Sequence, residues 1–551
     1  MKKIGLIVLL SVMVCSVWAV PARRGGMVVT QPDGTEVTVY QHGDEHFHWM
    51  TNEKGEWLKL DENGYYRVTK ALSNEEISVR RMTSPKRAAM EAYPLNIAPR
   101  GLVILVNFAD VAFETEKAEM DSMLTGKNYT RDYSYTYRSK TYNVQSQGSA
   151  RQYFEDVSFG QYNPQFDVVG PVTVSKEMSY YGQNDAYGSD KYAEKMIEEA
   201  CKLADTECNV DFSQYDNDED GYVDFVFVIY AGYGEADGGK SNTIWPHAWN
   251  LYTAAGRKCE VDGKVVDLYA CGNELDSYSE KHTGIGTFCH EFSHVLGLPD
   301  LYETNNRNKH NNKTLGSWDI MDYGPYSNDG NTPPTFSAYE RFFMGWLTPR
   351  LITDPENVVL TDLKESNEAL LISSSDQHNL IGNNPSPTTF YMIENRQQEG
   401  WDKHLPGHGM MLTKILYDYN KWFENTVNNT SSKMGVDLIE ADGKAPSYDE
   451  QKPNNGYDGK AGDLFPAGAK AYTKIADHAI EAITEVDGVI KFKYKGGETE
   501  PETAEENTVA KEEVIAVYNI LGQKQMTTDI ESLPHGTYVV VTSKGNHKIV
   551  R

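Results

Sequence analysis

Basic residues are scarce in this sequence of 551 residues. It has 52 lysines and arginines against 80 aspartates and glutamates, which gives a formal net charge of −28 at pH 7. An acidic surface of this size repels phosphate backbones, so we expect no nucleic-acid partner. The hydrophobic fraction of 39% still supplies enough apolar side chains for buried cores, which excludes a chain that is disordered throughout.

Long hydrophobic runs are missing as well, except at the N-terminus. There, two lysines precede the apolar run 4–17. Its 14 or so apolar residues are too few to cross a bilayer, which takes roughly 20. The pattern predicts a secretory signal peptide over residues 1–19, cleaved after Ala19. Since no later stretch has transmembrane length, we expect a secreted protein, extracellular or held at the cell surface, without a transmembrane segment.

Cysteine is the third scarce residue. Removal of the signal peptide leaves five cysteines, an odd number in an oxidising compartment. Cys259 and Cys271 flank a hairpin turn, and we expect a disulfide across it. Cys201 and Cys208 could close a second, shorter loop.

Turn signals and apolar runs divide the rest of the chain into segments. Residues 20–99 carry hairpin signals and then a polar, basic stretch, which predicts a β-rich pro-segment with a cleavable linker. Apolar runs at 101–108 and 225–230 predict buried strands, and the spacing at 190–203 predicts a helix. These elements indicate an α+β domain over residues 100–350.

The C-terminal half changes character. Short strands separated by polar turns predict a β-rich domain over residues 351–496. Residues 497–513 are acidic and nearly free of apolar side chains, as is typical of a linker. Alternation returns in residues 514–551, which predicts a small all-β module.

One pentapeptide carries the clearest chemical signal. His290-Glu291-Phe292-Ser293-His294 has the pattern H-E-x-x-H. Histidines four residues apart lie on one face of a helix, so both imidazoles can bind one zinc ion. Glu291 then projects beside the open coordination position, where zinc lowers the pKa of bound water and the carboxylate takes its proton. The pattern predicts His290 and His294 as zinc ligands and Glu291 as general base.

A third zinc ligand has two candidates. Gly297 can adopt the positive φ that turns the chain back after the helix, which would bring Asp300 to the metal. A carboxylate is an accepted zinc ligand. The alternative is Glu340, on a later predicted helix. We expect Asp300, because Gly297 has no purpose in the other arrangement.

The segment 316–323 looks like the methionine turn below the zinc of metzincin-type enzymes, with Met321 as its methionine. Tyr323 follows two positions later. Its phenol could stabilise the charge that develops on a tetrahedral intermediate. An equally good interpretation is that Tyr323 is a structural residue packed under the turn.

A second metal site is predicted upstream. Acidic residues at alternate positions, followed by glycine, resemble an EF-hand-type calcium loop that lacks the usual glutamate at its twelfth position. The expected ligands of a structural calcium ion are Asp216, Asp218, Asp220, the backbone carbonyl of Tyr222, and Asp224. The alternative is an acidic turn without an ion.

Over residues 100–490 the chain resembles the secreted metallopeptidases of the immune inhibitor A family. The resemblance rests on the segments 105–110, 216–234, 244–247, 290–300, 345–347, 394–397 and 400–407. It implies a zinc endopeptidase that acts on protein or peptide substrates, with a zincin-like catalytic domain and a β-rich domain after it. The small β unit at residues 25–72 is similar to the pro-segments of exported peptidases, which implies a zymogen.

The last segment, 514–551, is similar to the β-sandwich sorting domain of the type IX secretion system of Bacteroidota. This resemblance implies contact with the outer-membrane secretion machinery. We therefore expect a secreted, monomeric zinc endopeptidase made as a zymogen. The competing hypothesis is a non-catalytic adhesin or binding protein that retains zinc for stability. Glu291 distinguishes the two, because a purely structural zinc site has no need of a carboxylate at the open position.

Overall fold

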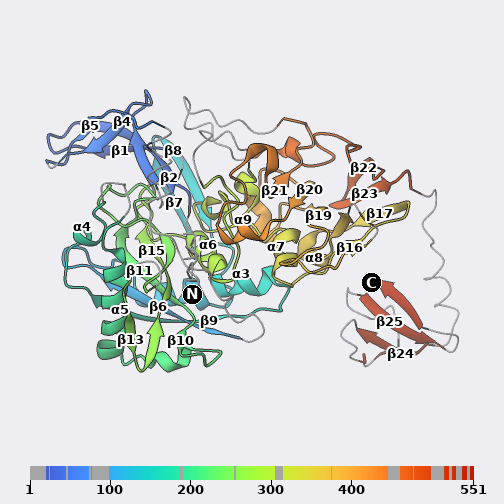
Figure 1. Cartoon of the computed structure of the whole chain (residues 1–551), viewed down its shortest axis with the longest axis horizontal. Helices are drawn as coiled ribbons and strands as arrows, with labels where there is room; N and C mark the ends of the chain where they lie inside the picture. The colour runs from blue at the N-terminus through green and yellow to red at the C-terminus, as the bar shows by residue number, and fades with distance from the viewer. Residues whose placement is uncertain are drawn as a thin grey trace, which may run out of the picture.

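The computed structural model describes most of the chain (Figure 1). The described residues are 20–23, 25–44, 47–61, 63–73, 76, 98–184, 190–252, 256–304, 314–373, 375, 377–444, 459–475, 477–497, 514–519, 524–525, 527–528, 537–542 and 546–550. They form a mixed α/β structure with several β-sheets, as the sequence predicts. The expected signal peptide and most of both expected linkers lie outside the described residues.

The N-terminal segment forms an antiparallel sheet whose strands follow one another in chain order. The strands are β1 (Gly26–Thr30), β2 (Glu36–Asp44), β3 (Phe47–Thr51), β4 (Trp57–Leu60) and β5 (Tyr66–Val68). The sheet lies beside the hairpin of β7 (Asp132–Tyr137) and β8 (Lys140–Gln145), as Figure 1 shows. Tyr137 in that hairpin donates a hydrogen bond to the carbonyl of Gly26 at 2.9 Å.

A five-stranded sheet forms the centre of the next segment. Its order is β12 (His247–Asn250), β15 (Leu268–Leu275), β11 (Val226–Tyr233), β6 (Arg100–Asn107) and β9 (Gln165–Thr173). All neighbours are parallel except β12, which is antiparallel at one edge. Strands β6 and β11 are continuous apolar runs because helices cover both of their faces.

Alternate residues of β6 point to two different cores. Val103 and Leu105 pack with α3 (Ala150–Val157) and α6 (Gly286–Val295). Leu102 and Ile104 pack with α5 (Ala193–Cys208) on the opposite face. The period of two along a strand produces this division. The smaller elements around the sheet are α2 (Lys117–Thr125), α4 (Met178–Tyr181), η1 (Phe212–Tyr215), β10 (Tyr222–Val223), β13 (Cys259–Val261), β14 (Lys264–Val266), η2 (Gly316–Trp318), η3 (Gly324–Tyr326) and α7 (Ala338–Phe343).

The expected disulfides are absent from the part of the chain that the structure describes, where all five cysteines are free. Cys259 lies on β13, which pairs with β14 in the expected hairpin, whereas Cys271 lies on β15 in the central sheet. The pairing across the hairpin turn is therefore wrong, because the chain passes into a second sheet before it reaches Cys271. The sulfur that neighbours Cys259 is that of Cys201 on α5.

Two further sheets lie in the segment after residue 350. One has the order β16 (Arg350–Leu351), β18 (Leu370–Ser373), β19 (Thr389–Arg396), β20 (Gly409–Leu416) and β21 (Val436–Leu438), and the other β17 (Glu356–Leu360), β23 (Val489–Tyr494) and β22 (Ile480–Val486). The short helices here are α8 (Leu363–Ser366), η4 (Gly400–His404), α9 (Tyr419–Phe423), η5 (Ser431–Lys433) and η6 (Ala461–Asp463). Phe390 and Met411 share one apolar core with Phe292 and Trp318, so this segment packs directly against the one before it.

The C-terminal segment contains β24 (Val514–Asn519), β25 (Thr537–Thr542) and β26 (Asn546–Val550), paired as one antiparallel sheet. A sandwich needs a second sheet, and the described residues of this segment form only this one. Nowhere among the described residues is there a helix with the length and hydropathy to span a membrane.

Candidate active site

Helix α6 carries the H-E-x-x-H motif at the centre of the molecule. His290, Glu291 and His294 are fully buried on it. The helix ends at Val295, and Gly297 has a φ of 104°, a conformation that favours glycine. The chain reverses there as the sequence predicts. The reversal brings Asp300, also fully buried, back to the two histidines.

Three ligand atoms meet at one point. The Nε2 atoms of His290 and His294 are 3.0 Å apart, and each lies 3.3 Å from Oδ1 of Asp300. Ligands at 2.0–2.1 Å from a tetrahedral zinc ion are separated by about 3.3 Å, which is the edge of that tetrahedron. The donor set and its spacing therefore suit zinc.

Backbone and amide groups hold each of these side chains from behind. His290 Nδ1 lies 2.7 Å from the carbonyl oxygen of Ile320, and His294 Nδ1 lies 2.8 Å from that of Leu298. A carbonyl can only accept, so each Nδ1 carries a proton, and in the neutral imidazole this leaves the Nε2 lone pair available to a metal ion. Asn425, in the segment after α9, donates from Nδ2 to Oδ2 of Asp300 at 2.5 Å.

Burial and charge put His294 and Asp300 in the metal-binding form. At His290, burial lowers the pKa, but Asp300 and Glu291 outweigh it and the pKa is raised. Burial lowers the pKa of His294 to about 4. Burial alone would raise the pKa of Asp300, but the two histidines outweigh it and bring that pKa down to about 2. At neutral pH the imidazole of His294 is therefore neutral and the carboxylate of Asp300 is ionised, as metal binding requires.

Glu340, the alternative third ligand, lies elsewhere. It sits in the first turn of α7, where its Oε2 accepts hydrogen bonds from the backbone nitrogen of Ser337 at 2.7 Å and from its hydroxyl at 3.0 Å. This is a capping box at the start of the helix. Among the described residues, the carboxylate that joins the two histidines is that of Asp300.

The turn around Met321 lies beneath the histidines. Met321 is fully buried, its carbonyl accepts from the backbone nitrogen of Leu301 at 2.7 Å, and the preceding carbonyl is the one that orients His290. Tyr323 is partly buried, with its ring 5.0 Å from that of Tyr326. The catalytic role of Tyr323 stays a prediction.

The N-terminal segment reaches into the site, which the sequence did not indicate. The backbone nitrogen of Val20 donates to Oε1 of Glu291 at 3.1 Å, and Val20 itself is 1% exposed. Its carbonyl accepts from Trp245 Nε1 at 3.2 Å. The hydroxyl of Tyr326 donates to the carbonyl of Pro21 at 2.7 Å. A stretch of backbone thus lies over the general base that the motif predicts.

His48 shows how the N-terminal sheet is attached. The sequence favours surface positions over a metal site for His42, His46 and His48, yet His48 is buried against the central segment. Its Nε2 lies 3.1 Å from Oε1 of Glu235, and its ring stacks on that of Trp245 with centroids 4.4 Å apart. His42 contacts Thr51 at 2.8 Å instead, and His46 lies outside the described residues.

The acidic loop before β10 gathers three of the five expected calcium ligands. Oxygens of Asp216, Asp218 and Asp220 all lie within 4.8 Å of one another. Asp216 also pairs with Lys264 Nζ at 2.6 Å, so part of the negative charge is already balanced. Oδ2 of Asp224 accepts from the backbone nitrogen of the asparagine at position 217 at 2.6 Å. Calcium at this loop therefore stays a prediction.

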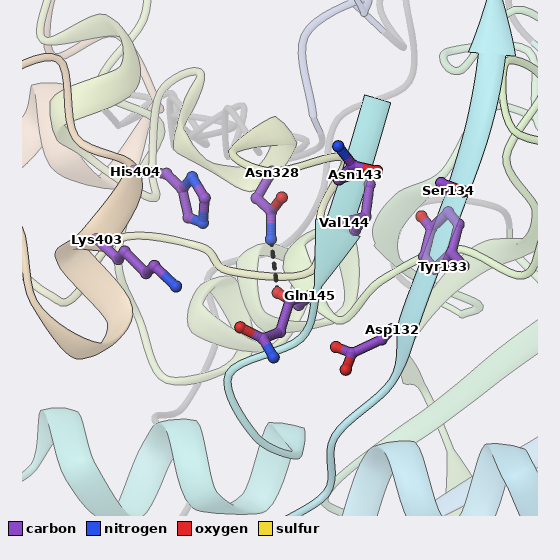
Figure 2. Close-up of a pocket in the computed structure, with 9 residues that line it drawn as sticks. All are labelled: Asp132, Tyr133, Ser134, Asn143, Val144, Gln145, Asn328, Lys403 and His404. Atoms are coloured by element: carbon purple, nitrogen blue, oxygen red, sulfur yellow. Dashed lines mark hydrogen bonds between the residues drawn. The ribbon is translucent and has the colours of Figure 1, made fainter. Parts of the chain in front are cut away.

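A wider pocket of about 510 Å³ lies between the β7–β8 hairpin and η4 (Figure 2). Lys403 and His404 face β8 across it, and Asn328 donates from Nδ2 to the carbonyl of Gln145 at 2.8 Å. None of the nine residues drawn belongs to the histidine and aspartate group on α6. The pocket borders the loop that continues to Asp329 and is separate from the buried histidine and aspartate group.

Comparison with known proteins agrees with this geometry. Residues 98–347 match the family model described as "Immune inhibitor A peptidase M6, catalytic domain". "Immune inhibitor A" of Bacillus thuringiensis subsp. alesti is 28% identical over 297 residues, which cover 47% of this chain and 41% of that protein. "Pre-pro-metalloprotease PrtV" of Vibrio cholerae serotype O1 is 27% identical over 271 residues, covering 44% of this chain and 29% of that protein.

The chain thus spans less than half the length of the curated relatives it matches. The family match covers the central sheet, α6 and the turn around Met321, where the buried histidines and aspartate lie. The comparisons support the assignment of the segment 98–347 to the catalytic domain of a metallopeptidase of the immune inhibitor A family.

Proposed function

We propose that this protein is a secreted zinc endopeptidase that hydrolyses peptide bonds of extracellular proteins and is made as a zymogen. The observation that carries the proposal is the group of three buried ligand atoms, separated by 3.0–3.3 Å, with the buried Glu291 next to His290 on the same helix. His290, His294 and Asp300 would hold the ion. When bound, zinc polarises the scissile carbonyl and makes water a stronger acid.

The chain's own groups carry the protons. Glu291 takes a proton from the attacking water and later delivers it to the nitrogen of the leaving amine. The contact from the Val20 nitrogen to Oε1 at 3.1 Å supports this role, because it demonstrates that a peptide nitrogen can lie within hydrogen-bond reach of the carboxylate. In this proposal Tyr323 adds a hydrogen bond to the developing oxyanion.

The test is Glu291→Gln in the full chain. We expect zinc content and melting temperature close to those of the unmodified protein, with casein hydrolysis reduced by about 10²- to 10⁴-fold, the usual contribution of general acid–base catalysis. Glu368→Gln, at an exposed position, is the matched control and should keep full activity. Unchanged hydrolysis by Glu291→Gln would overturn the mechanism and favour the competing function, an adhesin or binding protein with a structural zinc.

The zymogen proposal is supported by the segment 20–23, which covers Glu291. A substrate cannot reach that carboxylate until this segment leaves. We propose that the N-terminal segment is removed after cleavage in the basic linker between residues 80 and 100, and that the C-terminal module acts in sorting at the outer membrane and is removed within residues 497–513. N-terminal sequencing and intact mass of the protein from culture medium test both. A fully active form that begins at Val20 would contradict the zymogen proposal.

A further inference from the structure

The segment Val20–Arg23 lies in the site as an extended peptide would. Val20 and Ala22 are buried with Ala236 and Trp245 in one small apolar cluster. The backbone of the segment is bound at several points besides Glu291, including the nitrogen of Arg23, which donates to the carbonyl of Ala236 at 2.9 Å. Hydrogen bonds to the backbone do not depend on the sequence of the bound segment. The side chains of the segment, in contrast, indicate which kind of substrate side chain each part of the cleft can bind.

Arg23 is the side chain with the most specific surroundings. Its Nη1 pairs with Oδ1 of Asp237 at 2.7 Å and with the carboxylate of Asp276, and its Nη2 pairs with Oδ1 of Asp329 at 2.8 Å. The guanidinium also lies over the ring of Tyr278, 4.3 Å from the ring centre. Only 10% of the Arg23 side chain is exposed. Three carboxylates and an aromatic face therefore enclose one cation.

This acidic pocket is built by the catalytic segment itself. Asp276 Oδ1 accepts from the backbone nitrogen of Ser279 at 2.6 Å and from its hydroxyl at 2.7 Å, so the other oxygen is held towards Arg23. Asp329 Oδ2 accepts from the hydroxyl of Tyr135 at 2.8 Å, which fixes it in the same way. Without Arg23 the three carboxylates would repel one another, and a cationic side chain of a substrate would reduce that repulsion.

The contact at Glu291 sets the register of the bound segment. A general acid at this position protonates the nitrogen of the leaving amine, and the nitrogen found there is that of Val20. Val20 therefore takes the place of the first residue after the cleaved bond. Arg23 takes the place of the fourth.

We propose that Asp237, Asp276 and Asp329, with Tyr278, form a specificity subsite for an arginine or lysine side chain four residues after the cleaved bond of the substrate. This inference rests on the proposed endopeptidase function. Arg23 of the N-terminal segment occupies the subsite until that segment is removed. The pocket therefore first helps to keep the cleft closed, and after removal of the segment it selects substrates.

The experiment uses the zinc-loaded protein recovered from culture medium in its natural processed form. The substrates are quenched fluorescent peptides with Val-Pro-Ala-Xaa after the cleaved bond and a randomised sequence before it, where Xaa is Arg, Lys, Gln or Glu. A charge-assisted hydrogen bond contributes more to binding than a neutral one. We therefore expect kcat/KM for the Arg and Lys peptides to exceed that for the Gln peptide by about tenfold or more. Glu should be the poorest of the four.

Two variants assign the preference to the pocket. Asp276→Asn and Asp329→Asn should each lower the ratio of kcat/KM for the Arg and Gln peptides towards one, and either suffices if the other fails to fold. Asp354→Asn, an exposed carboxylate outside the cleft, should keep both the ratio and the rates.

Hydrolysis with equal rates for all four peptides would overturn the subsite while leaving the endopeptidase function intact. A basic preference before the cleaved bond instead of after it would overturn the register. No hydrolysis of any peptide or of casein would overturn the endopeptidase function, and the subsite with it.

Discussion

Asn425 should control zinc affinity from outside the motif. Its Nδ2 donates to Oδ2 of Asp300 at 2.5 Å, and its Oδ1 accepts from the backbone nitrogen of Asp300 at 2.8 Å. These two bonds orient the carboxylate so that its other oxygen faces His290 and His294. Loss of such a supporting hydrogen bond costs about 10- to 100-fold in metal affinity, or about 1.4–2.7 kcal/mol.

The substitution to make is Asn425→Gly. Asn425 has a φ of 51°, so glycine removes the side chain without adding backbone strain, which alanine would introduce. Asn128→Gly is the matched control, because Asn128 has a φ of 58° and is exposed in the loop between α2 and β7. The assay is zinc competition against a chromogenic chelator in the full chain. Equal affinity in the two variants would refute the argument that Asn425 positions Asp300.

The remaining predictions concern ligands, catalysis, calcium and pH. Asp300→Ala should lose most of the bound zinc while Glu340→Ala keeps it, as measured by elemental analysis, and the reverse pattern would assign the third ligand to Glu340. Tyr323→Phe should lower kcat with little change in KM; a kcat equal to that of the unmodified protein would leave Tyr323 as a packing residue. Replacing Asp218 and Asp220 together by asparagine should abolish any rise of Tm on adding calcium, and an unmodified protein whose Tm ignores calcium would show the loop to be an acidic turn. Burial raises the pKa of Asp437 to about 6 from its ordinary 3.8, so its contribution to stability is present below pH 4 and is lost as the pH rises through 6. Asp437→Asn should therefore raise Tm at pH 8 and leave it unchanged at pH 4, and a gain of equal size at both pH values would contradict this.

The parts of the site that the sequence predicts are those within one helix and its exit. The spacing of four places His290 and His294 on one face of α6, and Gly297 turns the chain so that Asp300 returns after six residues. Local geometry alone fixes these relations. The long apolar runs of β6 and β11 likewise predict buried strands, because both of their faces are covered.

The parts that the sequence does not predict depend on contacts between distant residues. Asn425 reaches Asp300 across 125 positions, and Val20 reaches Glu291 across 271. No periodicity or motif in the sequence predicts such a contact, because the contact depends on how whole sheets pack against one another. The same reason explains the wrong disulfide: Cys259 and Cys271 are close in sequence, but they lie in different sheets. In the sequence, the group of asparagines just after α9 was the one feature that could have indicated a role for Asn425.

The functional unit extends beyond the segment that matches the family model. That match ends at residue 347, yet Asn425 orients Asp300 and the side chain of Asn428 donates to the carbonyl of Leu301 at 2.7 Å. Asn429 continues the series by accepting from the backbone nitrogen of Thr304 at 2.7 Å. The stretch that carries Asp300, the proposed third ligand, is therefore held by the segment after α9, and the apolar core is continuous across residue 350. A change in the composition of the sequence marks that position, but the proposed zinc site depends on residues from both sides of it.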